Sequence, residues 1–243
     1  MRTNLLSLML IAALALMPMA LPLQAQSNGV QRTDQLPTEH LRNLRKKMNA
    51  GRTLGTRDLR ALADAADGLA AFKYGKWLEE QGKPQLLPDA AHYYAIASYT
   101  DRDFAVRRLV ALLALPGLEL TGPRTSEALD AMTHQAQTGN ADAAMALSQM
   151  YASGKPFGKD ADAVRKWLEV AANAGRGDAA VKLALAYMVP TDGAAPDHAK
   201  AREALALAAT QPDPGTKAMA QTLLARLGTM SAPLVTPIEG VSE

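Results

Sequence analysis

The 243-residue chain contains no cysteine, and this absence excludes disulfides, thiolate metal sites, thiol nucleophiles and a lipidated N-terminal cysteine. Aromatic residues are scarce, at 5%. The 26 Lys and Arg are nearly balanced by 24 Asp and Glu. This balance argues against a protein whose main role is to bind a polyanion through a basic arm. A single long apolar run excludes a polytopic membrane protein. The 48% of hydrophobic residues still suffice for a folded core.

The apolar run lies at the N-terminus. Arg2 is the only charged residue among the first 25, and the stretch from Leu5 to Leu23 follows it. This pattern predicts a secretory signal peptide over residues 1–25, cleaved after Ala25, and therefore an exported, periplasmic protein. An uncleaved membrane anchor is the alternative, since the stretch is nearly long enough to span a bilayer. Pro18 and Pro22 interrupt it and favour the signal peptide.

A period of about 36 residues organises the rest of the chain. In the clearest unit, Ala143, Leu147 and Tyr151 follow one another at intervals of four and share one helical face. Gly154 can end that helix, and Asp160 is a plausible N-cap for the next one, which Gly175 closes. Equivalent positions of successive first helices fall at Leu78, Leu113, Tyr151 and Tyr187, which are 35, 38 and 36 residues apart.

Such a repeat predicts an all-α solenoid of about five helix-turn-helix pairs over residues 37–228. Alanine pairs such as Ala171-Ala172 allow neighbouring helices to approach closely, and large residues such as Trp167 fill the gaps between repeats. Trp77 is expected in the core as well. Residues 26–36 form a linker, segments 37–48 and 56–66 a degenerate leading pair, 215–227 a closing helix and 229–243 a flexible tail.

Segments 142–154 and 160–175 resemble the first and second helices of a Sel-one-like repeat, a relative of the tetratricopeptide repeat. The alanine pair and the closing glycine are the specific part. Ser148, Ala184 and Pro190 stand where the family usually has glycine. The resemblance implies a right-handed α/α superhelix whose first helices line a concave groove. It also implies a non-enzymatic adaptor, often in bacterial envelope assembly or signalling; one exported member type restrains a sensor kinase that controls exopolysaccharide synthesis.

The sequence contains only weak signals of metal sites, cofactor sites or catalytic residues. The four histidines fall in different repeats without a partner at i+3 or i+4, so no metal site or cofactor is predicted. Gly175-Arg176-Gly177 follows no strand and does not indicate a dinucleotide loop, and no G-x-S-x-G motif is present. The carboxylate pairs Glu79-Glu80 and Asp160/Asp162 leave a polysaccharide or cell-wall hydrolase, or its accessory subunit, as the alternative function. The histidines are His40, His92, His134 and His198.

Basic residues recur at one position of the repeat. The site just before Tyr74, Leu109 and Leu183 holds Lys73, Arg108 and Lys182, whereas the fourth equivalent site is Ala146. We expect these cations to form a basic ladder on the concave face that binds an acidic or C-terminal segment of a protein partner. A solvated helix face whose basic residues align by chance is the alternative. With their neighbours, the residues of the ladder are Lys73, Lys76, Arg107, Arg108 and Lys182.

The sequence therefore predicts an exported scaffold or adaptor that binds protein, not nucleic acid, and that is not inserted in the membrane once the signal is removed. Regulation of envelope signalling or polysaccharide pathways is the expected setting. Binding of a small ligand in the groove is a third hypothesis, but no aromatic-lined pocket supports it. No signal for an oligomeric state is present.

Overall fold

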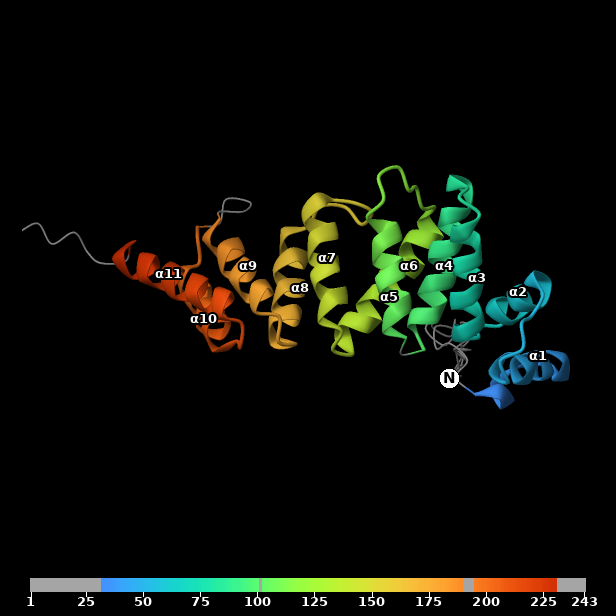
Figure 1. Cartoon of the computed structure of the whole chain (residues 1–243). Helices are drawn as coiled ribbons and strands as arrows, with labels where there is room; N and C mark the ends of the chain where they lie inside the picture. Colours follow the sequence, from blue (N-terminus) through green and yellow to red (C-terminus); the bar gives the residue numbers. More distant parts are fainter. Residues whose placement is uncertain (1–31, 101, 190–194, 231–243) are drawn as a thin grey trace, which may run out of the picture.

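The computed structural model describes residues 32–100, 102–189 and 195–230. Across these ranges it contains α-helices and two short 3-10 turns but no strand, which confirms the all-α prediction (Figure 1). None of the described helices is long and apolar enough to cross a membrane. The predicted signal peptide and most of the predicted tail lie outside the described residues. The helices are α1 Glu39–Asn49, α2 Thr56–Asp64, α3 Gly68–Glu80, α4 Leu87–Ser98, α5 Asp103–Leu113, α6 Gly122–Gln137, α7 Ala141–Ser153, α8 Ala161–Asn173, α9 Gly177–Met188, α10 His198–Thr210 and α11 Pro214–Met230.

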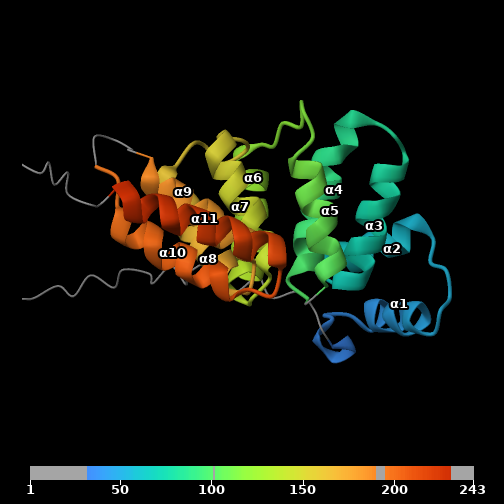
Figure 2. The ribbon, with the colours of Figure 1, turned by 60° about the vertical axis from the view of Figure 1, so that its left-hand side comes forward.

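The helices stack in a row from α1 at one end to α11 at the other (Figures 1 and 2). The pairs α3/α4, α7/α8 and α9/α10 pack most closely, and each pair packs on the next. The second helices α4, α6 and α8 contact one another along one side, while α5 contacts α7 and α9 contacts α11 along the other. The chain is therefore a solenoid of helix pairs, as its repeats predicted.

Polar caps and glycines set the ends of the helices where the sequence placed them. The side chain of Asp160 accepts a hydrogen bond from the Ala163 backbone at 2.9 Å and starts α8. Gly154, with φ of 84°, ends α7 in the left-handed conformation. Asp197 caps α10 through the Lys200 backbone at 3.0 Å. Asp160 and Gly154 therefore lie at the helix ends for which the sequence proposed them.

Small residues let the helices approach closely. Ala171 and Ala172 are completely or almost completely buried. Between α3 and α4, a Cβ added to Gly75 would lie 3.1 Å from a ring carbon of Tyr94 and 3.2 Å from the Ala90 carbonyl oxygen, so only glycine fits without a shift. Trp167 is 4% exposed and fills the inter-repeat position assigned to it.

Trp77 corrects the sequence-based prediction. Its side chain is 36% exposed instead of buried. It lies one residue before the buried Leu78, at the edge of the apolar face of α3, and stacks on the Tyr74 ring with centroids 5.5 Å apart. Trp77 therefore covers one side of the buried Tyr74 ring, which gives the partly exposed Trp77 a packing role.

Candidate protein-binding face

The odd-numbered helices from α3 onward present one surface, which we call the first-helix face. In the described residues six large hydrophobic side chains are exposed, and all six belong to these helices or follow them by one or two residues. The even-numbered helices expose none. Exposed apolar side chains mark an interaction surface where they form a contiguous patch, and singly they are ordinary. These side chains are Trp77, Phe104, Leu115, Leu185, Val189 and Met219.

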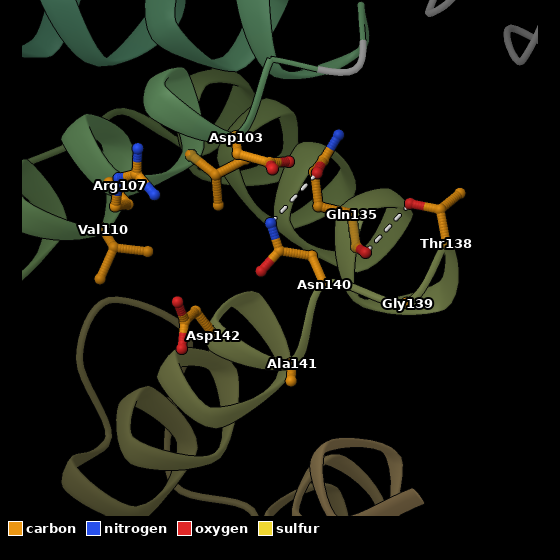
Figure 3. A pocket seen from close by; sticks show the side chains of 10 residues that line it. Asp103, Arg107, Val110, Gln135, Thr138, Gly139, Asn140, Ala141 and Asp142 are labelled. Atoms are coloured by element: carbon orange, nitrogen blue, oxygen red, sulfur yellow. Dashed lines mark hydrogen bonds between the residues drawn. The ribbon is translucent and has the colours of Figure 1, made fainter. Parts of the chain in front are cut away.

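The first-helix face is hollowed between α5 and α7. One cavity, of about 590 Å³, lies at the N-terminal ends of the two helices. There Arg107 and Val110 of α5 face Asp142 of α7, and Asp103 also lines the opening (Figure 3). A second cavity, of about 810 Å³, lies at the C-terminal ends and shares Val110 as a wall. Together the two cavities form one groove along the α5–α7 interface.

The two ends of this groove differ in chemistry. The second cavity is mainly apolar, with Leu113 and Leu115 on the α5 side and Met150 on the α7 side. The first cavity has a mixed lining that includes the charged side chains of Asp103, Arg107 and Asp142, and it rests on a buried layer of hydrogen bonds. In that layer the Gln135 amide donates to the Ser98 carbonyl of α4, and the Asn140 amide donates to Gln135 at 3.4 Å (Figure 3). These bonds join α4, α6 and the start of α7, so the polar end has a firm base.

An irregular connection opens the groove. Helices α5 and α6 hardly contact each other, unlike the pairs α3/α4, α7/α8 and α9/α10. Residues 114–121 run between them as an irregular link that contains Pro116 and Gly117. Helix α6 packs instead on α4 and α7. The link also supplies Leu118 and Leu120 to the apolar cavity. The sequence held one signal of this feature, the 38-residue spacing between Leu113 and Tyr151, two or three residues longer than the others.

The basic residues predicted from the repeat register are all exposed on α3, α5 and α9. Three of the five are paired with carboxylates. Lys76 lies 3.5 Å from Glu80, Arg108 3.3 Å from Glu79, and Lys182 3.9 Å from Asp178. Lys73 and Arg107 form no ion pair within the described ranges. Arg107 lines the groove, whereas Lys73 lies in a separate small cavity beside α1.

An ion-pair cluster borders the polar end of the groove. Arg176 donates to Asp178 at 2.9 Å and also to Asp142, which ties the start of α9 to the start of α7. The hydrogen bond from Arg176 lowers the pKa of Asp178 below its ordinary value. Asp142 is therefore partly neutralised, and Asp103 lies in the first turn of α5, where the helix dipole stabilises a carboxylate. Arg107, one turn after Asp103 on α5, forms no ion pair within the described ranges and is the lining cation at this end.

The residues considered for catalysis have structural partners. Glu79 accepts a hydrogen bond from the Tyr94 hydroxyl at 2.7 Å as well as from Arg108, and Asp160 caps α8. His92 contacts Glu127 on α6 at 2.7 Å. No group of three or more His, Asp or Glu residues suited to a metal occurs in the described part of the chain. The arrangement supports packing contacts between repeats more directly than acid–base chemistry.

Comparison with solved structures identifies the class of fold, the Sel1-like repeat solenoid. The chain aligns with a Sel1 repeat protein from Oxalobacter formigenes at 24% identity and a TM-score of 0.52, over 86% of this chain and 56% of that protein. A protective antigen of uropathogenic Escherichia coli with an SLR fold aligns at 15% identity and a TM-score of 0.45, over 77% of this chain and 42% of the antigen. This chain thus spans about half the length of these proteins. No family profile and no curated protein matches it.

Proposed function

We propose that the protein is an exported, non-catalytic scaffold that binds a segment of another envelope protein in the groove between α5 and α7. The observation that carries the proposal is the groove between α5 and α7, which has one mainly apolar end with the exposed Leu115 and one end lined by charged side chains. Export is supported by the N-terminal signal pattern in the sequence. We further propose that this scaffold regulates envelope signalling or a polysaccharide pathway.

The groove defines the segment it would accept. Helix α5 has eleven residues and is about 16 Å long at 1.5 Å per residue, which matches about five extended residues. A large apolar side chain fits the cavity beside Leu115 and Met150, and an acidic group would pair with Arg107 at the other end. The rest of the basic ladder, Lys73 above all, would add attraction for an acidic partner.

Site-specific photocrosslinking in the periplasm tests this proposal. A photoreactive residue at Gln149 or Leu115, both in the groove, should trap one discrete protein, whereas the same residue at the exposed Ala206 on α10 should not. Arg107→Glu should abolish the crosslink, and Lys217→Glu, on α11, should leave it intact. Equal crosslinking from the groove and from Ala206 would refute the proposed face.

A further inference from the structure

Positive charge is concentrated at one end of the array. Residues 32–60 contain eight Lys and Arg but only three Asp and Glu, although the whole chain carries a net charge of only +2. Residues 61–230 contain 17 basic and 19 acidic residues, so they carry no such surplus. Extending the count to Asp64, the end of α2, adds one acidic residue, so α2 is balanced and the surplus lies in α1 and the turn after it. This part of the array is a cationic end that the overall composition conceals.

Several of these cations have no acidic partner. Arg45 and Arg60 pair with Asp67 and Asp64. In contrast, the exposed side chains around the turn between α1 and α2 form no ion pair in the part of the chain that the structure describes. They are Lys46, Lys47, Arg52 and Arg57.

Arg52 lines a cavity that is also lined by Lys73 of α3. The cavity has a volume of about 130 Å³ and is lined by Arg52 and Thr53 from the α1–α2 turn and by Lys73 from α3. No carboxylate lines it; the remaining walls come from Met48, Gly51, Leu54 and Leu59. Two cations that form no ion pair with any described residue thus line one small cavity.

The end of α1 places Arg52 there. Gly51 has a φ of 77°, a conformation that favours glycine. Its N–H donates to the Met48 carbonyl at 3.0 Å, and the Arg52 N–H donates to the Lys47 carbonyl at 3.0 Å. This pair of bonds is the Schellman motif, which fixes the direction in which the chain leaves a helix. The position of Arg52 beside Lys73 is therefore built into the turn.

The geometry points to a binding site for a small oxyanion of the phosphate type, held by Arg52 and Lys73 with the Thr53 hydroxyl as a further donor. A guanidinium and an ammonium are the groups that proteins use to bind phosphate oxygens. The cavity is smaller than the roughly 300–1,000 Å³ of sites for drug-sized ligands, so it suits a single anionic group. That group is either a free anion or a phospholipid headgroup, and the site does not depend on the proposed protein binding.

Isothermal titration calorimetry of the full chain with inorganic phosphate tests the site. Arg52→Gln and Lys73→Gln should each weaken phosphate binding about tenfold or more, because each removes a charge-assisted hydrogen bond. The matched control Lys46→Gln removes a neighbouring charge outside the cavity and should change the affinity less than about twofold. No phosphate binding, or equal weakening by all three variants, would overturn the proposal. All three side chains are exposed, and unchanged circular dichroism spectra will confirm the fold.

Vesicles distinguish the two sources of the anion. The full chain and the double variant Arg52→Gln/Lys73→Gln share the same apolar N-terminal stretch, so the difference between them reports the cavity alone. If phosphatidylglycerol vesicles bind more of the full chain than of the double variant, while phosphatidylcholine vesicles bind both equally, the site binds a lipid headgroup. If neither vesicle separates them but inorganic phosphate does, the ligand is a free anion.

Discussion

A buried ion pair attaches the first helix to the array, and its removal gives the most informative test of the stability argument. Asp67 precedes α3 and is 1% exposed at its side chain. One carboxylate oxygen accepts a hydrogen bond from the Ala70 backbone at 2.9 Å and caps α3. The other lies 2.9 Å from Nε of Arg45 on α1, whose side chain is 9% exposed. The same carboxylate therefore starts one helix and holds another.

Two substitutions separate these roles. Asp67→Asn keeps an oxygen for the Ala70 N–H but leaves the Arg45 charge buried without its counter-ion, which we expect to cost about 3 kcal/mol. Asp67→Ala also removes the cap and should cost about 1 kcal/mol more. Replacing Arg45 with Met in the Asp67→Asn background should recover most of the loss, since no unpaired charge then remains. The exposed pair of Asp89 with Arg124 serves as control, and Asp89→Asn should cost about 0.5 kcal/mol.

The assay must resolve single helices, because a stack of repeats can open at one end while the rest stays folded. Hydrogen exchange of Asp67→Asn should show lost protection in α1 and the start of α3, with α7 to α10 unchanged. Urea unfolding gives the accompanying free energy. The reasoning is refuted if Asp67→Asn lowers stability by less than about 1 kcal/mol, or if α9 loses as much protection as α1.

The remaining predictions concern packing and titration. Trp167→Ala should lower the free energy of unfolding in urea by about 3–5 kcal/mol and Trp77→Ala by about 1 kcal/mol, because only the first ring is fully buried; equal losses would contradict the burial argument. Burial raises the pKa of Tyr99 to about 12, so its neutral form stabilises the fold below pH ~10 and this contribution is lost as the pH rises through ~12; thermal melts of Tyr99→Phe should show a weaker alkaline loss than the wild type. Arg176 lowers the pKa of Asp178, so the stability that this ion pair contributes is present above the ordinary pKa of about 4 and is lost as the pH falls below it. The contribution should be below about 1 kcal/mol, because the carboxyl is 46% exposed. In acid titration the free energy of unfolding of Asp178→Asn should therefore fall less steeply than that of the wild type.

The repeat architecture could be predicted because its determinants are local. Alanine and leucine at intervals of four define each helix, and caps such as Asp160 and Asn140 define its ends. Two of the ion pairs on the basic ladder could also have been anticipated, since Lys76–Glu80 and Asp178–Lys182 are i, i+4 neighbours on one helix. The pair Arg108–Glu79 joins different helices and has no local signal.

The groove could not be predicted because it depends on how α5 and α7 lie relative to each other. Its walls come from consecutive elements, α5, the link after it, α6 and α7, and no single one of them carries a binding motif. Helical periodicity identifies an apolar face, but it does not show which apolar residues a neighbouring helix covers. The exposure of Trp77 has the same origin, because the sequence does not show which face of α3 its neighbours cover.

The two proposed sites lie on different parts of a structure in which each repeat contacts mainly its neighbours. The cationic cavity is formed by α1, α2 and α3, whereas the groove is formed by α5, α6 and α7. Variants without shared contacts have additive effects, so Arg52→Gln should leave crosslinking in the groove unchanged and Arg107→Glu should leave phosphate affinity unchanged. A loss of both activities from either variant would show that the helices between the sites transmit a change, and that the array acts as one unit and not as a row of independent repeats.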